Sequence, residues 1–248
     1  MARGHPPVFL PRRVVLCGRR AALAAVFFVA MSAASSAVAA PINLVTNGDF
    51  SAGNSDFTTS YLYAPVPCSA NPPTCSGEYT IGTSPFSWFN AFVTTGDHTT
   101  GTGNMFLGNG AGTPDTVWKS TVGGLDLNTN YFFEAFLMNI CCNNQVRPGP
   151  ALEFYANNVL LGLGATNTPG IWTGISTPWN SGLFSSVDLE LRNASTVFDG
   201  NDFALDDVYL GKESEVDGAP MPEPASLFLL GAGLVTVARR ARRGSKPC

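Results

Sequence analysis

The sequence has very few basic residues outside its two ends. Of its 14 lysines and arginines, five precede residue 21 and five follow residue 238. Residues 41–220 contain 17 acids against four bases, a balance of −13; the bases are Lys119, Arg147, Arg192 and Lys212. Nucleic acids and anionic lipid surfaces attract proteins through lysine and arginine. We therefore expect no nucleic acid partner and no unaided binding to an anionic membrane.

Histidines and catalytic motifs are also scarce. Outside the first 40 residues His98 is the only histidine, in the turn-like stretch Gly-Asp-His-Thr-Thr-Gly. The chain contains no G-x-S-x-G, H-E-x-x-H, P-loop or G-x-G-x-x-G motif. A nucleophilic triad needs a partnered histidine base, so we interpret His98 as a polar loop residue and predict that the protein is not an enzyme.

The first 40 residues have the pattern of a secretory signal peptide. A basic region ends at Arg19 and Arg20, an apolar run covers residues 21–31, and Ala37-Val38-Ala39 forms an A-x-A cleavage site. The strongly apolar part is shorter than the ~20 residues that a membrane-spanning helix needs. We therefore predict that residues 1–40 direct export and are removed.

Between the two ends, the pattern predicts one all-β domain over residues 41–212. Residues 187–192 alternate strictly between apolar and polar, as in a strand with one wet face, and residues 131–140 are apolar on both faces. Asn157-Asn158 separates two short strands, and asparagine tolerates the positive φ of a two-residue hairpin. Strands are predicted at 44–50, 86–93, 104–107, 116–122, 131–140, 153–156, 159–162, 172–176, 187–192 and 203–210.

These short strands with turns between them indicate a single jelly-roll-like antiparallel sandwich. Residues 213–220 form a charged linker. In the closing strand, Phe203 and Leu205 share one parity whereas Val208 and Leu210 share the other. Because a one-residue slip moves side chains across a sheet, we predict a bulge or break near Asp206-Asp207.

Four cysteines remain after Cys17 and Cys248 are set aside, namely Cys68, Cys75, Cys141 and Cys142. In the oxidising compartment that a signal peptide implies, four cysteines allow three disulfide pairings. We consider a bond between the adjacent Cys141 and Cys142 strained. The other two pairings both join the proline-rich loop to the end of the long strand. A zinc site is the less favoured alternative because the spacing does not match common zinc motifs.

The C-terminal tail combines a triplet, an apolar run and a basic cluster. Pro222-Glu223-Pro224 is followed by an apolar segment over residues 225–238 and then by Arg239, Arg240, Arg242 and Arg243. A short apolar helix with a positive stop is one reading, and an ordinary membrane anchor is the other. The order of these features closely resembles the PEP-CTERM sorting signal of Gram-negative bacteria, here over residues 221–248.

That resemblance implies a route for the protein. In that family the membrane protease-transpeptidase exosortase recognises the triplet and removes the tail, and the cargo reaches the cell surface or the extracellular polysaccharide matrix. We therefore expect the secretion machinery and exosortase as partners. The 225–238 helix would be in the inner membrane transiently.

Two further segments resemble the first and last strands of galactose-binding-like jelly rolls, the fold of many carbohydrate-binding modules. These segments are residues 43–51, Asn-Leu-Val-Thr-Asn-Gly-Asp-Phe-Ser, and residues 201–210, Asn-Asp-Phe-Ala-Leu-Asp-Asp-Val-Tyr-Leu. In that fold the two strands lie together and a structural calcium often bridges them. Asp207 matches one ligand position, Ser51 stands where the family usually has Glu, and Asp49 offers an oxygen nearby. The alternative is that Asp206 and Asp207 are solvated acids at a strand end.

Carbohydrate binding would use exposed aromatic rings. Trp88 and Trp172 lie in apolar stretches that predict core positions, whereas Trp179, Tyr61 and Tyr63 are the candidates for a ligand platform. We predict an exported, exosortase-sorted surface or matrix protein that is non-catalytic and binds exopolysaccharide. A secreted glycoside-active hydrolase, which needs only two carboxylates about 5–10 Å apart, is the first alternative. A structural or ice-contacting matrix protein is the second.

Overall fold

The computed structural model describes residues 41–65, 76–142, 148–195, 197 and 200–216. The predicted signal peptide and the sorting tail lie outside these residues. No helix in the described part of the chain is long and apolar enough to cross a membrane.

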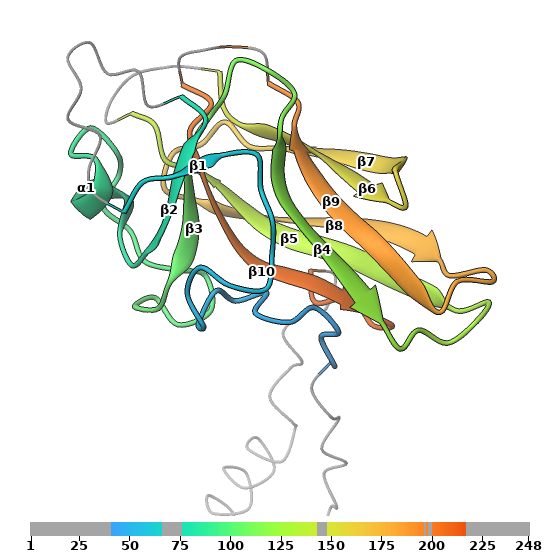
Figure 1. Ribbon diagram of the computed structural model, residues 1–248. Coiled ribbons are helices and arrows are strands. Elements are labelled where there is room, and N and C mark those ends of the chain that lie inside the picture. Colours follow the sequence, from blue (N-terminus) through green and yellow to red (C-terminus); the bar gives the residue numbers. More distant parts are fainter. Residues whose placement is uncertain (1–40, 66–75, 143–147, 196, 198–199, 217–248) are drawn as a thin grey trace, which may run out of the picture. The chain divides into compact units, whose positions relative to one another are not determined.

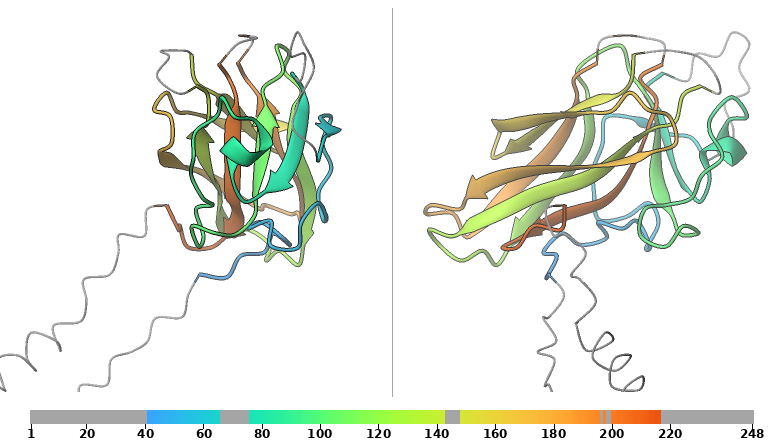
Figure 2. Two further views of the ribbon diagram at one scale, coloured as in Figure 1. Left: turned by 90° about the vertical axis from the view of Figure 1, so that its left-hand side faces the viewer. Right: turned by 180° about the vertical axis from the view of Figure 1, so that it is seen from behind.

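The described residues form two facing β-sheets, which Figures 1 and 2 show from three sides. The larger sheet has the order β1-β2-β3-β10-β5-β8 and the smaller the order β4-β9-β6-β7. Neighbouring strands are antiparallel except for the short β1–β2 pair. The elements are β1 (Leu62–Tyr63), β2 (Glu78–Gly82), α1 (Pro85–Trp88), β3 (Met105–Asn109), β4 (Thr116–Gly123), β5 (Asn130–Asn139), β6 (Ala151–Ala156), β7 (Val159–Ala165), β8 (Trp172–Asn180), β9 (Ser186–Asn193) and β10 (Phe203–Gly211). The predicted all-β sandwich is confirmed.

Aromatic side chains fill the space between the sheets. Phe106 is fully buried and stacks on Tyr79 at 4.8 Å and on Phe203 at 5.9 Å between ring centroids. Phe133 of β5 meets Phe154 of β6 edge to face at 5.0 Å, which ties one sheet to the other. Buried aromatic pairs of this kind stabilise a fold both through their area and through ring geometry.

Several local predictions are confirmed. Residues 187–192 lie within β9 and residues 131–139 within β5. The hairpin between β6 and β7 turns at Asn157 and Asn158, whose φ angles are 48° and 63°. The pairing of β10 with β5 shifts between Asp206 and Tyr209, and Asp207 has a φ of 45°. This shift is the predicted bulge of the closing strand.

The predicted strand at 44–50 is wrong, although its place beside the closing strand is right. Leu44 donates its N–H to the carbonyl of Leu210, and Gly48 accepts the N–H of Val208. The segment nevertheless turns, because Asn47 and Phe50 have positive φ angles of 53° and 52°. A Cβ atom on Gly48 would lie 2.0 Å from the Val208 carbonyl oxygen, so only glycine allows this close approach.

The predicted strand at 86–93 is also wrong. Pro85 stands in the first turn of the short helix α1, where proline's fixed φ is favourable and its missing N–H costs nothing. The apolar residues around it contact the outer face of the large sheet, not a neighbouring strand. Trp88 is buried there, as predicted, and Trp172 is partly buried against the same cluster. The strands β1 and β2 were not predicted.

Candidate functional site

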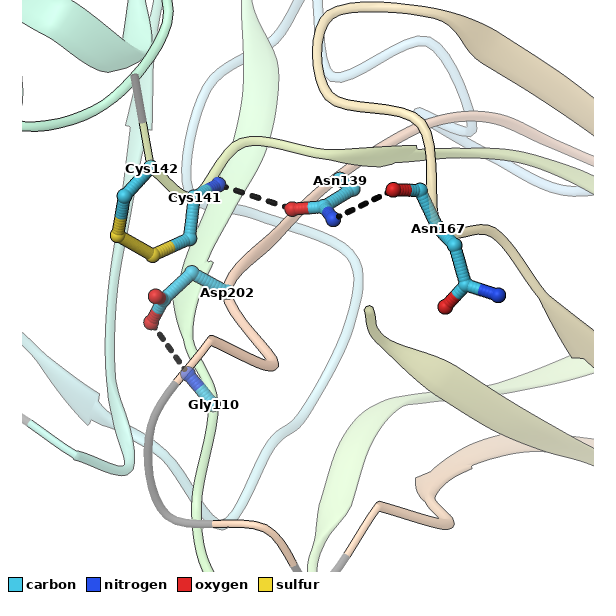
Figure 3. The surroundings of a disulfide bond; sticks show 6 residues. All are labelled: Gly110, Asn139, Cys141, Cys142, Asn167 and Asp202. Carbon is cyan, nitrogen blue, oxygen red and sulfur yellow. Dashed lines mark hydrogen bonds between the residues drawn. A yellow bond between two sulfur atoms is a disulfide. The ribbon is translucent and has the colours of Figure 1, made fainter. Parts of the chain in front are cut away.

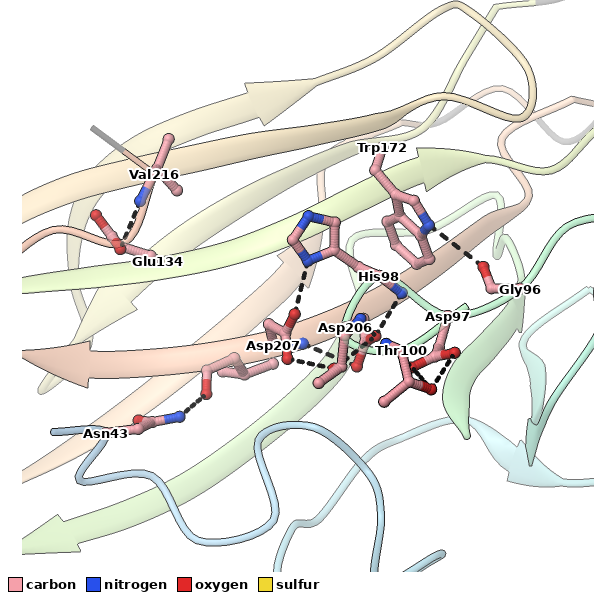
Figure 4. Close-up of polar contacts among 12 residues, drawn as sticks. Asn43, Gly96, Asp97, His98, Thr100, Glu134, Trp172, Asp206, Asp207 and Val216 are labelled. Carbon is pink, nitrogen blue, oxygen red and sulfur yellow. Dashed lines mark hydrogen bonds and ion pairs between the residues drawn. The ribbon is translucent and has the colours of Figure 1, made fainter. Parts of the chain in front are cut away.

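The bulge of β10 gathers polar groups on the outer face of the large sheet. Asp206 is fully buried there, and its Oδ2 accepts the N–H of His98 at 2.8 Å and the N–H and hydroxyl of Thr99 at 3.3 Å each. Its Oδ1 accepts the N–H of Asp207 at 2.9 Å. We call His98, Thr99, Asp206 and Asp207 the Asp206 cluster (Figure 4).

The carboxylate of Asp207 holds the His98 ring in place. Nδ1 of His98 lies 2.6 Å from Oδ2 of Asp207, and the Thr99 hydroxyl donates to Oδ1 at 2.6 Å. The imidazole stacks on Phe136, with ring centroids 3.5 Å apart, and meets the edge of Trp172 at 5.9 Å. The prediction of a histidine without catalytic partners is therefore wrong in one respect, because a carboxylate orients the ring. Among the described residues, no hydroxyl or thiol hydrogen-bonds to the imidazole as a nucleophile would.

A second buried carboxylate, Glu134 of β5, fixes the C-terminal end of the domain, residues 214–216, to the outer face of the large sheet. It accepts hydrogen bonds from the hydroxyls of Ser176 and Ser214, both at 2.5 Å. The N–H groups of Glu215 and Val216 also point at it, at 2.7 and 3.3 Å. The folded part thus continues to Val216, four residues beyond the predicted domain end at 212.

Burial and neighbouring charge set the protonation of these acids. Burial, together with the charge of Asp207, raises the pKa of Asp206 to about 7 despite its hydrogen bonds. Burial also raises the pKa of Glu215, with further contributions from Asp207 and Glu134. For Asp97, burial alone would raise the pKa. The N–H groups of Thr100 and Gly103 and the Thr100 hydroxyl outweigh it, so the pKa lies below 3.8.

A polar hollow of about 320 Å³ adjoins the Asp206 cluster. Apart from Gly103, the lining residues carry polar side chains: Asp49, Ser51, Thr83, Asp97, Thr99, Thr100, Thr102 and Asn104. Asp97 shapes one wall, since its carboxylate accepts the N–H groups of Thr100 at 2.8 Å and Gly103 at 2.6 Å. Thr99 borders the hollow and also donates to Asp207.

The two predicted calcium ligands have different surroundings. Asp49 lines the polar hollow and accepts the N–H and hydroxyl of Ser51 at 3.2 and 2.8 Å. Asp207 does not line the hollow, and its oxygens are bonded to His98 and Thr99. Calcium at these two residues therefore stays a prediction.

The predicted aromatic platform is not assembled. Tyr61 is buried with 5% exposure, and its hydroxyl accepts the N–H of Ala111 at 3.1 Å, so the prediction that it is exposed is wrong. Tyr63 is 44% exposed and lies on β1, whereas Trp179 is partly buried on β8. These strands form opposite edges of the large sheet. Since the rings are that far apart in the sheet order, they do not form one sugar-stacking surface.

The cysteine pairing differs from the one we favoured. A disulfide joins Cys141 to Cys142 directly after β5 (Figure 3), whereas Cys68 and Cys75 lie outside the described residues. A bond between adjacent cysteines closes only a small ring, so it does not carry the loop-closure entropy of a bond between distant cysteines. Beside them stands Asp202, buried with 7% exposure; burial raises its pKa to about 6.

Sequence reasoning missed Glu134, Asp97 and Asp202 as site residues. Glu134 interrupts a strand that is otherwise apolar on both faces, which signals a satisfied buried charge. Asp97 precedes a run of threonine and glycine typical of side-chain-capped turns. Nothing in the sequence near Asp202 points to the cysteines, which are about 60 residues away along the chain.

Comparison with known proteins identifies the tail. Residues 222–243 match the PEP-CTERM protein-sorting motif. The match covers Pro222, Glu223, Pro224 and the four arginines Arg239, Arg240, Arg242 and Arg243. The motif implies an exported protein that is anchored in the membrane through its C-terminus before exosortase processing. No curated protein matches the chain.

Solved structures similar to the chain include proteins of different activities. A cyclase from Fischerella sp. TAU is 15% identical with a TM-score of 0.47, over 70% of this chain and 99% of that one. The family 16 carbohydrate-binding module-2 is 17% identical with a TM-score of 0.39, over 68% and 99%. The EclA C-terminal domain, a sugar-binding protein, is 16% identical with a TM-score of 0.35, over 39% and 67%.

Proposed function

We propose that the protein is a non-catalytic component of the cell surface or extracellular matrix, and that it holds polysaccharide in the polar hollow. The sorting motif supports the destination. The ligand class is carried by the lining of the hollow, where carboxylates accept and threonine hydroxyls both donate and accept hydrogen bonds. Sugar hydroxyls likewise both donate and accept hydrogen bonds. The volume of about 320 Å³ is that of a small-molecule site.

The charge of the hollow narrows the ligand to a neutral polysaccharide. Asp49 and Asp97 are both acids, and none of the described residues that line the hollow is a lysine, arginine or histidine. An anionic sugar would meet like charge there without a base to pair with. Acidic polysaccharide would therefore bind only through a cation. Calcium suits the oxygen donors of this hollow, and Asp49 is the predicted ligand that lines it.

Binding is tested with the full chain in mild detergent on an array of neutral and uronic-acid glycans. We expect neutral glycans to bind, and the double variant Asp49→Ala with Thr102→Val to weaken binding about tenfold or more, as expected for losing contacts worth ~1.4 kcal/mol. Asp126→Ala is the matched control, because Asp126 is an exposed acid that pairs with Lys212 away from the hollow. The proposal would be overturned if no glycan bound, or if the double variant bound as tightly as the unmodified chain.

The same array run with a chelator separates the two modes of binding. Neutral glycan binding that survives the chelator supports direct hydrogen bonding by the hollow. Binding confined to uronic-acid glycans and lost with the chelator would contradict the neutral ligand and establish calcium as the bridge.

A glycoside-active hydrolase is the second candidate, and two observations favour it. His98 is oriented by Asp207 as a general base would be, and Asp206 has a pKa near neutrality. Release of reducing sugar from a bound polysaccharide, abolished by His98→Ala, would establish the enzyme. We expect no release from the unmodified chain, because no nucleophile or second partner is bonded to the ring among the described residues.

A further inference from the structure

The disulfide lies against a buried carboxylate, Asp202, just before the start of β10, whereas the Asp206 cluster lies at the bulge in the middle of that strand. Cys141 and Cys142 follow β5, and Asp202 directly precedes β10. The two sulfur atoms and a carboxylate oxygen of Asp202 all lie within 4.8 Å of one another. Within the described residues no other three such side chains converge this closely. Figure 3 shows Asp202 beside the sulfur bridge.

Among the described residues, few groups balance a negative charge on Asp202. The N–H of Gly110, at 3.2 Å, is the one partner from elsewhere in the described chain. The described bases pair with other acids: Lys119 and Arg192 with Glu190, and Lys212 with Asp126. A buried carboxylate without a cationic partner is costly. Its neutral form, which carries a proton, is the less costly state in this environment.

The two sulfurs differ in access. Cys141 is 2% exposed, whereas Cys142 is partly exposed. Because Cys142 is the more exposed of the two residues, we assign its sulfur as the one that an external thiolate attacks and the sulfur of Cys141 as the leaving group. A buried thiolate beside a carboxylate is unfavourable unless a proton arrives as the bond breaks.

We propose that Cys141, Cys142 and Asp202 form a thiol–disulfide exchange site for dithiol substrates, with Asp202 as the acid that protonates the departing sulfur of Cys141. This activity is separate from the proposed polysaccharide binding, because none of these residues lines the polar hollow.

The reaction balances without any further cofactor. One thiolate of the dithiol attacks Sγ of Cys142, the bond between the two protein sulfurs breaks, and Sγ of Cys141 takes the proton of Asp202. The second thiol of the substrate then attacks the mixed disulfide and releases Cys142. The substrate loses two electrons and two protons to become a disulfide, and the protein gains two thiols. The second substrate thiol returns a proton to Asp202, and the released Cys142 thiolate takes up from water the proton that the first substrate thiol gave up when it ionised.

The surrounding hydrogen bonds keep the chain in place while the bridge opens. The N–H of Cys141 donates to Oδ1 of Asn139 at 3.0 Å, and Nδ2 of Asn139 donates to the carbonyl of Asn167 at 3.4 Å. These bonds hold the main chain at the end of β5. The sulfur of Cys141 therefore stays near Asp202 in both redox states.

The test measures how fast dithiothreitol reduces this bridge in the full chain at about pH 5.5, below the Asp202 pKa of about 6, where the carboxyl group still carries its proton. Samples are quenched with acid and alkylated, and the peptide with Cys141 and Cys142 is followed by mass, so that the other cysteines do not contribute. We expect Asp202→Asn, which keeps the acceptor for Gly110, to slow reduction about tenfold or more, as for loss of a general acid. Asp202→Glu, which keeps a carboxyl group, should restore most of the rate.

Glu190→Gln is the matched control, because it neutralises a buried acid on the other sheet. A variant that only destabilises the fold would expose the bridge and speed its reduction, so slowing identifies the chemical role. Reduction of Asp202→Asn at the unmodified rate, or equal slowing in Asp202→Asn and Asp202→Glu, would overturn the proposal. Two free thiols in this peptide before any reductant is added would overturn it as well.

Discussion

Two buried aspartates, one just before β10 and one in the middle of that strand, differ in their hydrogen bonding. Asp206 receives hydrogen bonds from His98, Thr99 and Asp207, whereas Asp202 receives one, from Gly110. Burial raises the pKa of both carboxyl groups, to about 7 for Asp206 and about 6 for Asp202. At Asp206 the neighbouring charge of Asp207 adds to the effect of burial. Hydrogen bonds to a buried carboxylate lower its pKa and so oppose the effect of burial, but a neighbouring negative charge raises the pKa again.

Replacing Asp206 by a residue that does not titrate should have the largest effect on the pH dependence of stability. Its folded pKa of about 7 exceeds the ordinary 3.8, so the folded state favours the protonated form. Stability from this group is full below pH 3.8 and is lost as the pH rises through 7, by about 4 kcal/mol in total. We expect Asp206→Asn to flatten this fall in urea unfolding curves recorded from pH 4 to pH 8. An unchanged slope would show that Asp206 is not the group responsible.

The same unfolding experiment on an Asp202 variant should show a smaller change in the pH dependence of stability, with the same sign. A shift from 3.8 to about 6 corresponds to about 3 kcal/mol lost between pH 4 and pH 7. Asp202→Asn should therefore be more stable than the unmodified chain at pH 8, because it removes a poorly partnered charge. If the variant is less stable at that pH, the single hydrogen bond from Gly110 matters more than the charge.

Glu134 extends the comparison to a buried acid with four hydrogen-bond partners. Glu134→Ala removes the acceptor of the Ser176 hydroxyl and of the N–H groups of Glu215 and Val216, and one contact of the Ser214 hydroxyl. We expect a loss of about 2–3 kcal/mol in unfolding free energy, the cost of stranding partly buried donors. Glu134→Gln keeps one acceptor oxygen and should cost less. Equal losses in the two variants would point to packing instead.

His98→Ala should have the smallest effect on stability. It removes the contact with Asp207 and the stacking on Phe136, at a site that is one-third exposed. We expect a loss of about 1 kcal/mol from a partly solvated interaction. The main-chain N–H of residue 98 still reaches Asp206, so the pH slope between 4 and 8 should persist. Loss of that slope would mean that the imidazole, and not burial, controls Asp206.

The predictions from sequence succeeded where a feature depends on a few adjacent residues. The hairpin at Asn157 and Asn158 needs only two residues that tolerate positive φ. The bulge at Asp206 and Asp207 follows from the change of parity in one strand. The predicted strands at 44–50 and 86–93 failed because tertiary contacts, with Val208 and with the outer face of the sheet, decided their conformation.

The site residues were harder to predict, because a surface position and a core position can have the same local pattern. Tyr61 and Tyr63 both lie in one short polar stretch, yet the first is buried against Ala111 and the second is exposed. His98 lacked a visible partner because Asp207 is 109 residues away. Cys141 and Cys142 were expected to bond to distant cysteines, and the pairing of neighbours was dismissed on local strain alone.

The sequence by itself determined the β class, the turn at Asn157-Asn158, the kink of the closing strand and the PEP-CTERM motif at residues 222–243. Each of these is written in contiguous residues, where dihedral preference, side-chain alternation or a short motif suffices. Only the tertiary structure decided which acids are buried and which groups hydrogen-bond to them. His98 meets Asp206 across 108 residues and Ser214 meets Glu134 across 80. Burial and hydrogen-bond partners are properties of the assembled sheets, and no local pattern contains them.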